Sequence, residues 1–381
     1  MKNTKKPVKK KIKKASRPSI KLRLYDLFWC SRDWVQRVAL IIAIIFGFIC
    51  LISWGFSLWY GQKHKNEPLV YGTTFIPTYA RFFGLDPKET MDAAINDLHV
   101  KRFRLVSYWN EIEKNKGTYD FSELDWQVDK ATKAGADINL SVGLRQPRWP
   151  ECHMPTWAED TSYDQWYPEL TKFMTATVNR YKDNSRVVSF QVENEFFMTV
   201  FGDCPDFTRD RLIEEVALVK QLAPNKKIIV TRSNNWGGVP VNEPTPDIFG
   251  VAVYKRVWDQ TATFRYFEYP YPPWFYGSLA GLGELISGKP LYIHELQTEP
   301  WLPPDKGYKI NDINSIPEQN KSLDAKRLSE RLDYAEKTGM KTIDTWGVEW
   351  WYWRKVKAND PSLWNAAKEK FTETQNKSSN Y

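Results

Sequence analysis

The sequence is poor in the residues and motifs that hold metal ions or phosphate groups. Its 381 residues include only four histidines and four cysteines, and it contains neither an HExxH motif nor another zinc-ligand spacing. No glycine-rich loop follows the first strand-like segment, as it would in a dinucleotide-binding fold. No internal repeat of about 20 to 50 residues is present, and no low-complexity segment follows residue 37. We therefore expect a non-repetitive fold that binds no metal and no cofactor.

Positive charge is concentrated at one end of the chain. The net charge is +8, but residues 1–37 hold 13 Lys and Arg against two acidic residues and so carry +11. The rest of the chain holds 41 basic and 44 acidic side chains, a net charge of −3. A nucleic-acid-binding domain would concentrate positive charge on its folded part. We therefore predict no nucleic-acid partner.

A long apolar run follows the basic segment. Residues 38–60 are uncharged and end in Trp59 and Tyr60; as a helix they would extend about 35 Å, enough to cross a hydrocarbon core of about 30 Å. A cleaved signal peptide would have a shorter apolar region and a small-residue cleavage site. The excess of Lys and Arg before the run predicts a cytoplasmic N-terminus. We predict a single-pass signal anchor in the cell membrane, a cytoplasmic tail at 1–37 and an extracytoplasmic remainder.

Segments typical of strands and helices alternate after a polar linker at residues 61–68. The strand candidates lie at residues 69–76, 100–107, 136–142, 187–193, 227–231, 248–254, 291–296 and 341–346. The helix candidates lie at residues 86–99, 122–135, 164–182, 208–223, 322–338 and 361–371. Eightfold alternation is the signature of the α/β class (β/α)8 TIM barrel, which we predict at residues 69–371, before a polar tail at 372–381. A doubly wound open sheet is the alternative.

Two glutamates lie at the carboxyl ends of predicted strands. Glu195, in SFQVENEFF, ends the fourth strand, and Glu295, in LYIHELQ, ends the seventh. Catalytic groups of a TIM barrel lie at these ends, so the two carboxylates can face each other across one pocket. A facing pair of carboxylates is what a glycosidase uses to protonate a leaving oxygen and attack the anomeric carbon. The alternative is that either glutamate is a surface acid.

The motif QVENE followed by an aromatic residue, together with a strand-seven glutamate, resembles the clan-A retaining glycoside hydrolases. This superfamily of TIM barrels has cellulase-like and β-galactosidase-like members, and the resemblance covers most of residues 69–353. It implies a double displacement, with Glu195 as general acid/base and Glu295 as nucleophile, and no need for a metal. We expect the substrate to be an oligo- or polysaccharide with O-glycosidic bonds, expected to be β, and the predicted topology makes it extracytoplasmic. The catalytic domain is expected to be a monomer.

The resemblance also implies roles for four other residues. Asn194 would bind the sugar 2-hydroxyl, and Trp346 would form the platform under the sugar. Arg104 and Tyr254 would contact Glu295, because a guanidinium and a phenolic donor stabilise an ionised carboxylate. A structural salt bridge is the alternative for Arg104, and packing at the pocket rim is the alternative for Tyr254.

Tryptophans are frequent near the predicted active face. Those in loops after predicted strands are Trp109, Trp149, Trp157, Trp236, Trp258 and Trp301, and Trp350 follows the last strand. Aromatic side chains in several loops suggest several sugar subsites, and we predict that Trp109 and Trp350 contact the substrate. Core packing is the alternative for each of them.

Some residues compete with these assignments or depart from the resemblance. Glu193 is a competitor of Glu195 as the acid/base, and Glu299 is a competitor of Glu295 as the nucleophile. Cellulase-like members carry a histidine near the end of strand three, where this sequence has Arg145 and Gln146. Strand alternation points His294 away from the pocket, so we favour a buried structural role for it.

Two of the four cysteines fall in the predicted exported domain. Cys30 and Cys50 lie in the tail and the apolar run, whereas Cys152 and Cys204 lie in loops after strands three and four. They are the only possible pair within that domain, so we predict a disulfide. Two function classes remain at this stage: a membrane-anchored glycosidase, or a carbohydrate-binding barrel without catalysis.

Overall fold

The computed structural model describes residues 33–199, 202–233 and 243–378. The chain divides into two compact units, Met1–Ile52 and Ser53–Tyr381. Most of the predicted basic tail lies outside the described residues. Within the described ranges, one helix, α2 (Trp34–Lys63), is long and apolar enough to cross a membrane by length and composition. It contains the predicted apolar run and extends beyond it at both ends.

The second unit is a closed barrel of eight parallel strands, so the predicted TIM-like fold is confirmed and the open-sheet alternative is wrong. The barrel strands are β1 (Val70–Phe75), β2 (Arg102–Val106), β3 (Asp137–Val142), β4 (Val187–Val192), β5 (Lys227–Arg232), β6 (Ile248–Val253), β9 (Leu291–Gln297) and β10 (Thr342–Trp346). They pair in the order β1-β10-β9-β6-β5-β4-β3-β2. Most of their residues are buried, because parallel strands covered by helices face apolar surroundings on both sides. All eight predicted strands are present.

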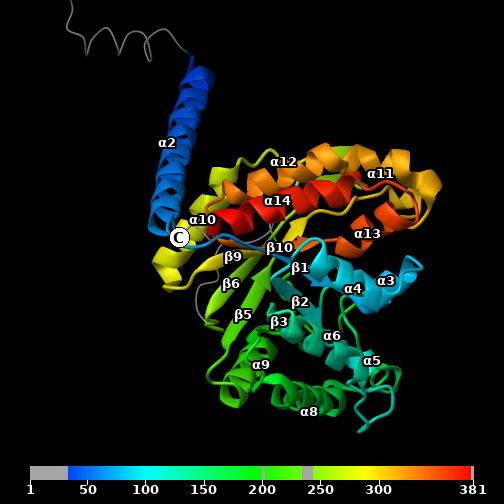
Figure 1. The fold of residues 1–381 in the computed structure, drawn as a ribbon. Helices are drawn as coiled ribbons and strands as arrows, with labels where there is room; N and C mark the ends of the chain where they lie inside the picture. The colour runs from blue at the N-terminus through cyan, green and yellow to red at the C-terminus, as the bar shows by residue number, and fades with distance from the viewer. Residues whose placement is uncertain (1–32, 200–201, 234–242, 379–381) are drawn as a thin grey trace, which may run out of the picture. The chain divides into compact units, whose positions relative to one another are not determined.

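Helices cover the outside of the barrel, with α8 and α9 on one side and α12 and α14 on another (Figure 1). Those that match predicted helices are α4 (Pro87–Asn96), α6 (Ser122–Lys133), α8 (Tyr163–Tyr181), α9 (Arg209–Leu222), α12 (Ala325–Glu336) and α14 (Ser362–Ser378). Helix α14 continues past residue 371, where the predicted helix ends.

Several elements were not predicted. The longer ones are the helices α10 (Pro273–Ser287) and α13 (Val348–Val356) and the antiparallel strands β7 (Arg256–Asp259) and β8 (Arg265–Glu268). The shorter ones are α3 (Pro77–Phe82), α5 (Trp109–Ile112), α7 (Thr156–Glu159), α11 (Ile316–Ser322), η2 (Pro304–Lys306) and η3 (Ile313–Ser315). The β7–β8 hairpin follows β6 and therefore belongs to the carboxyl face of the barrel.

A buried ion pair joins two strands inside the barrel. Arg102 Nε on β2 donates to Asp344 Oδ1 on β10 at 2.9 Å, and the Asp344 side chain is fully buried. Gly72, on the strand between them, leaves room for this pair, since a Cβ there would lie 2.2 Å from Asp344 Oδ1. Removing one partner of a buried pair costs about 3 to 5 kcal/mol. Replacing either Arg102 or Asp344 alone would leave the other charge buried without its partner. We therefore expect single substitutions at these two positions to destabilise the barrel.

The last turns of α2 pack against α10 within the second unit. A Cβ added to Gly281 would lie 2.7 Å from a backbone carbonyl of α2, so the two helices touch at their backbones. Beyond this contact, Tyr60 donates through its hydroxyl to the first carbonyl of β9 at 3.1 Å, and His64 Nε2 bonds to Glu284 Oε2 at 2.7 Å. The segment 61–68, predicted to be a polar linker, is therefore partly helical and packed against the barrel.

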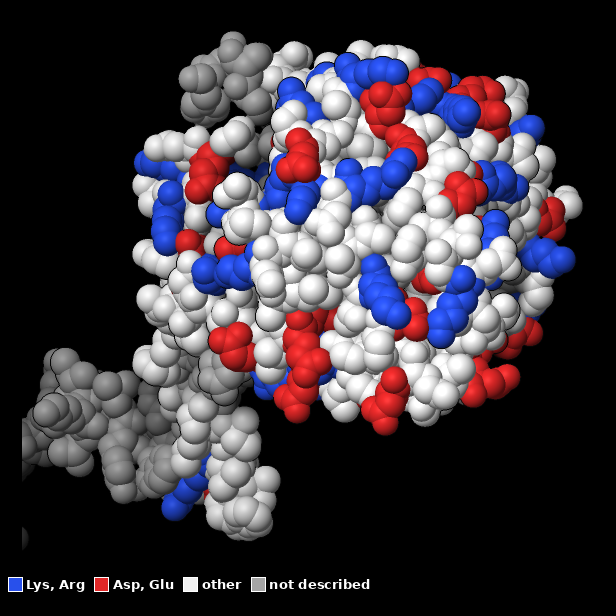
Figure 2. Space-filling model, turned by 90° about the horizontal axis from the view of Figure 1, so that it is seen from below, with Lys and Arg blue, Asp and Glu red and all other residues white. Residues whose placement is uncertain are grey.

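One face of the molecule mixes the two signs of charge (Figure 2). Figure 2 shows Lys and Arg side chains interspersed with Asp and Glu side chains over one face. That face offers no continuous positive surface of the kind that binds a phosphate backbone.

Cys152 and Cys204 form a disulfide, as predicted, with their Cα atoms 5.3 Å apart. They join the loop after β3 to the loop after β4 across 52 residues of chain. The crosslink therefore connects two of the loops on the carboxyl face of the barrel.

Replacing Cys152 and Cys204 together by serine is expected to lower the free energy of unfolding by about 2 to 4 kcal/mol, because the crosslink restricts the unfolded chain. Denaturant unfolding of the full chain in detergent under non-reducing conditions measures the effect. Cys50→Ser is the matched control, since Cys50 is a free cysteine. An unchanged unfolding midpoint in the double variant would contradict the prediction.

Candidate active site

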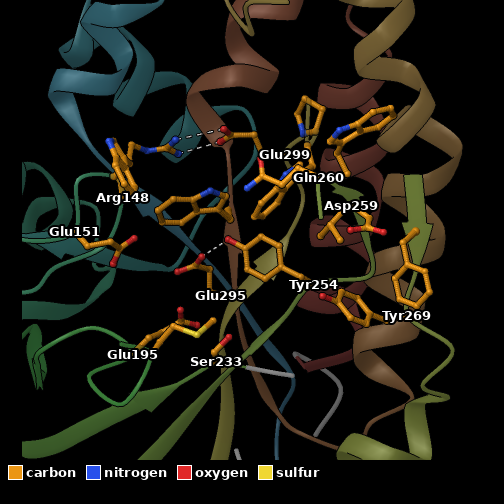
Figure 3. Close-up of a pocket in the computed structure, with 18 of the residues that line it drawn as sticks. Arg148, Glu151, Glu195, Ser233, Tyr254, Asp259, Gln260, Tyr269, Glu295 and Glu299 are labelled. Atoms are coloured by element: carbon orange, nitrogen blue, oxygen red, sulfur yellow. Dashed lines mark hydrogen bonds and ion pairs between the residues drawn. The ribbon is translucent and has the colours of Figure 1, made fainter. Parts of the chain in front are cut away.

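A pocket of about 490 Å³ opens at the carboxyl ends of the barrel strands. Glu195 follows β4, Tyr254 follows β6, Glu295 lies near the carboxyl end of β9 and Trp346 ends β10, and all four line this pocket. Figure 3 shows the side chains of Glu195 and Glu295 directed into the same space. The structure thus brings the two predicted catalytic carboxylates together although they are separated by 100 positions in the sequence.

Two donors hold the Glu295 carboxylate. Arg104 Nη1 donates to Oε2 at 3.1 Å, and the Tyr254 hydroxyl donates to Oε1 (Figure 3). Burial, followed by the charge of Glu295, raises the pKa of Tyr254 well above its usual value, so the phenol keeps its proton. Both contacts stabilise an ionised carboxylate, which is the form that a nucleophile needs.

Glu195 occupies a different environment. Its backbone N–H donates to Thr231 Oγ1 at 2.8 Å, while its side-chain Oε1 is buried and has no hydrogen-bond partner among the described residues. Burial, followed by the negative charges of Glu295 and Glu151, raises the pKa of Glu195 well above its usual value. These surroundings favour the protonated carboxyl group that a general acid needs.

Glu193 has turned away from the pocket. Regular alternation would place Glu193 and Glu195 on the same face, but both have positive φ, 59° and 43°, after the end of β4. The Glu193 carboxylate accepts hydrogen bonds from the backbone N–H groups of Leu144 and Arg145 at 2.7 and 2.8 Å, and pairs with Arg211 at 3.1 Å. Glu193 therefore supports the loop after β3 and does not compete with Glu195.

The Asn194 amide is largely engaged by protein groups. Its Oδ1 accepts from Arg104 Nη2 at 2.6 Å and from Gln191 Nε2 at 3.2 Å, and its Nδ2 donates to Glu151 Oε2 at 3.1 Å. Only 2% of the residue is exposed. A sugar hydroxyl that contacts Asn194 would have to share the amide with Glu151.

Glu151 is a third carboxylate in the pocket, and the sequence analysis missed it. It lies in the loop after β3, lines the pocket and has its Oε2 3.7 Å from Arg145 Nε. Burial raises its pKa to about 7, although Arg145 and the hydrogen bond from Asn194 act in the opposite direction. Its place in the loop after β3 could have identified Glu151 as a candidate, because that loop belongs to the active face of the barrel. The sequence analysis considered only acids at strand ends.

Glu151→Gln is expected to shift the alkaline limb of the kcat/KM profile to lower pH. The negative charge of Glu151 raises the pKa of Glu195, so removing that charge lets Glu195 lose its proton at lower pH. A pH series of kcat/KM measures the limb, and Glu159→Gln, an exposed acid in α7, is the control. A limb that stays in place or moves to higher pH would rule out this coupling.

The predicted tryptophan contacts are only partly supported. Trp346 lines the pocket. Trp109 and Trp350 are fully buried in the core, where their Nε1 atoms donate to Glu113 and Gln319, so the prediction that they contact substrate is wrong. The other pocket-lining tryptophans are Trp149, Trp258 and Trp301. Trp157 packs edge-on against Trp109, and Trp236 lies outside the described residues.

Glu299 is engaged in an ion pair with Arg148. Arg148 Nη2 donates to Glu299 Oε2 at 2.9 Å and Nη1 donates to Oε1 at 3.3 Å (Figure 3). Glu299 is thus the ion-pair partner of Arg148, and Glu295, whose side chain shares its space with that of Glu195 (Figure 3), remains the candidate nucleophile. Arg148, like Glu151, is a pocket residue that the sequence analysis missed.

No cluster of three or more His, Cys, Asp or Glu side chains that could hold a metal is found among the residues that the structure describes. His294 is fully buried, and burial lowers its pKa well below the usual value. It is therefore a neutral residue of the barrel wall. The polar groups that line the pocket include the carboxylates of Glu195 and Glu295, the guanidinium of Arg148 and the phenol of Tyr254.

Comparisons with known proteins identify the family of this chain. Residues 64–263 match the Cellulase domain, glycosyl hydrolase family 5. The β-galactosidase BbgII of Bifidobacterium bifidum is 31% identical over 131 residues, which are 29% of this chain and 19% of that relative. The chain thus matches less than a fifth of the length of this curated relative.

Solved structures share the fold. A β-galactosidase from the Antarctic haloarchaeon Halorubrum lacusprofundi superimposes with a TM-score of 0.52 at 13% identity, covering 81% of this chain and 58% of that one. A GH5_18 protein from Streptomyces cattleya in complex with GlcNAc gives a TM-score of 0.53 at 12% identity, covering 81% of this chain and 80% of that one. The domain match spans more than half of the chain. This chain belongs to glycosyl hydrolase family 5, the cellulase family of clan-A barrels.

Proposed function

We propose that this protein is a membrane-anchored retaining glycosidase that hydrolyses β-O-glycosidic bonds of an extracytoplasmic oligo- or polysaccharide. The observation that carries the proposal is the contrast between the two glutamates of the pocket. Glu295 accepts hydrogen bonds from Arg104 and Tyr254, whereas Oε1 of Glu195 is buried and has no hydrogen-bond partner among the described residues. Like groups in opposite environments are suited to opposite roles.

In the first step, Glu295 attacks the anomeric carbon while Glu195 donates its proton to the glycosidic oxygen. The bond to the leaving sugar breaks, and a covalent glycosyl-enzyme forms on Glu295. The hydrogen bonds from Arg104 and Tyr254 hold Glu295 in one orientation, so that little reorganisation is needed as the new bond forms. Asn194 and Glu151 lie beside Glu195, where polar groups can contact a sugar hydroxyl.

In the second step, Glu195 acts as a base. Having lost its proton, it removes a proton from a water molecule that attacks the anomeric carbon from the side opposite Glu295. The bond to Glu295 breaks and Glu195 regains its proton. Two inversions at one carbon give net retention.

The names of the related structures support a β-linked substrate. They include an exo-β-1,4-mannosidase from an Opitutaceae bacterium and an endo-β-1,4-xylanase from Gloeophyllum trabeum. These titles describe those proteins, and at 13% identity the likeness concerns the fold. They favour β-glycosides as the first compounds to test.

The membrane anchor and its orientation are supported by three features. Helix α2 has the length and apolarity of a membrane span, the basic residues precede it, and the catalytic unit contains a disulfide, which is typical of an exported domain. Protease treatment of intact cells should degrade the barrel and spare residues 1–37. Protection of the barrel would refute the orientation.

Proton NMR of the first sugar released from a panel of aryl β-glycosides tests the mechanism. We expect the full chain to release the β-anomer first, with the α-anomer forming only by later mutarotation. If the α-anomer forms first, the enzyme inverts and Glu295 is not a nucleophile. If oligosaccharides bind without any turnover, equally in wild type and in Glu195→Gln, the barrel is a carbohydrate-binding module instead.

A further inference from the structure

An ion pair that bridges two loops lines one side of the pocket. Arg148, from the loop after β3, pairs through two nitrogens with Glu299, which follows β9. The side chains are only 18% and 10% exposed. Bidentate pairs of this kind have a well-defined geometry. Because both side chains are largely buried, the Arg148–Glu299 pair is a fixed part of the pocket wall.

Two aromatic rings contact the Arg148 guanidinium. It lies 3.3 Å from the ring centroid of Tyr79 and 4.4 Å from that of Trp346, distances at which a cation is attracted to a ring face. The Tyr79 hydroxyl also donates to Glu299. We call the set Tyr79, Arg148, Glu299 and Trp346 the Arg148 wall.

The backbone is adapted to the Arg148 wall. Gly347, with φ of 108°, follows Trp346, and a Cβ there would lie 2.8 Å from the Glu299 Cβ. Arg148 itself has a φ of 84°, an uncommon conformation for a residue with a side chain and one that is often found at functional sites. Four segments of the chain, after β1, β3, β9 and β10, therefore meet to close this side.

The open part of the pocket extends in another direction. Beyond the catalytic glutamates it is lined by the β7–β8 hairpin and its flanks, including Trp258, Asp259, Phe267 and Tyr269. In the view of Figure 3, Glu295 lies between Glu195 and the Arg148–Glu299 pair. In this view the Arg148–Glu299 side of the pocket is therefore next to Glu295 and farther from Glu195 (Figure 3).

The roles of the carboxylates determine which part of a substrate meets the wall. Glu195 must contact the glycosidic oxygen, so the leaving part of the chain extends past Glu195. The attacked sugar lies over Glu295, and any sugar attached to its non-reducing side extends away from Glu195. That direction leads to Arg148 and Glu299.

We propose that the Arg148 wall restricts the enzyme to the non-reducing ends of β-linked glycan chains, which it removes one sugar at a time. This rests on the proposed glycosidase function and specifies its substrate as a chain end. A sugar preceding the cleaved unit would collide with the Arg148–Glu299 pair. Arg148 and Glu299 are specificity-determining residues, since the reacting atoms are held by other groups.

Reducing-end-labelled β-linked oligosaccharides, with and without a chemically blocked non-reducing end, test the proposal. We expect the full-length wild type to shorten free chains by one sugar per event and to leave blocked chains intact. Arg148→Ala and Glu299→Gln should raise the rate on blocked chains, relative to the rate on free chains, at least about tenfold. Arg148→Lys, which keeps the charge and much of the volume, should give a smaller change.

The ratio of the two rates does not depend on the fraction of folded protein, so a destabilised variant is still informative. Cleavage of internal bonds or of blocked chains by the wild type would overturn the proposal and leave the glycosidase function standing. An unchanged ratio in both variants would overturn the role of Arg148 and Glu299. Absence of cleavage of every aryl glycoside and oligosaccharide would instead overturn the glycosidase function and this proposal with it.

Discussion

Glu295→Ala is expected to lower kcat/KM by at least about 10⁴-fold, because it removes the nucleophile on which both steps depend. The truncation leaves space below the anomeric carbon, next to Arg104 and Tyr254, which hold the carboxylate in the native protein. A small anion such as azide can enter this space and attack in place of the carboxylate. We therefore expect azide to restore turnover of an activated aryl β-glycoside, giving an α-glycosyl azide that NMR identifies.

Glu299→Ala is the matched control for this experiment. It removes a carboxylate of the same pocket that pairs with Arg148, and it should neither abolish turnover of aryl glycosides nor respond to azide. An α-glycosyl azide formed by Glu299→Ala and not by Glu295→Ala would reverse the assignment.

Glu195→Ala is expected to show an effect that depends on the leaving group. General acid catalysis contributes about 10² to 10⁴ in rate, so kcat/KM should fall by that factor for substrates with a sugar leaving group. Aryl glycosides with acidic phenols need no protonation, and their first step should remain nearly as fast as in the wild type. A series of phenols of different acidity measures this as a steeper dependence of kcat/KM on leaving-group pKa.

Azide distinguishes Glu195→Ala from Glu295→Ala. In Glu195→Ala the covalent intermediate still forms on Glu295, so azide should react with it and give a β-glycosyl azide, opposite in configuration to the product of Glu295→Ala. Glu195→Gln, which keeps the shape of the side chain, should show the same leaving-group dependence. Equal losses for all leaving groups would point to a structural role for Glu195.

The barrel could be predicted because its strands carry strong local signals. Each combines a short apolar run with a turn or helix start on either side, and parallel strands buried on both faces produce such runs. Helix α10 was missed because it lacks the local signal that marks a surface helix. Its exposed positions include Leu282, Leu285 and Ile286, so the helix lacks the alternation of apolar and polar faces that marks an amphipathic helix.

The candidate site was predictable where its residues lie at or just after the carboxyl ends of strands, and unpredictable where they lie further along the loops. Glu195 and Glu295 follow from strand ends, since a barrel places these ends around one pocket. Glu151 and Arg148 depend on the path of the loop after β3, and a single sequence does not determine that path. The error for Trp109 has the same origin, because its place in a loop did not reveal that its ring points into the core.

The packing of α2 on α10 has a consequence for how the protein finds its substrate. A catalytic domain on a flexible tether sweeps a large volume and can turn its pocket in any direction. Here Tyr60 and His64 bond to groups of the barrel and Gly281 lies against the α2 backbone, so from Ser53 onward the helix and the barrel move as one body. The pocket therefore keeps one orientation relative to residues 53–63, and a substrate has to approach it from the side on which the pocket opens.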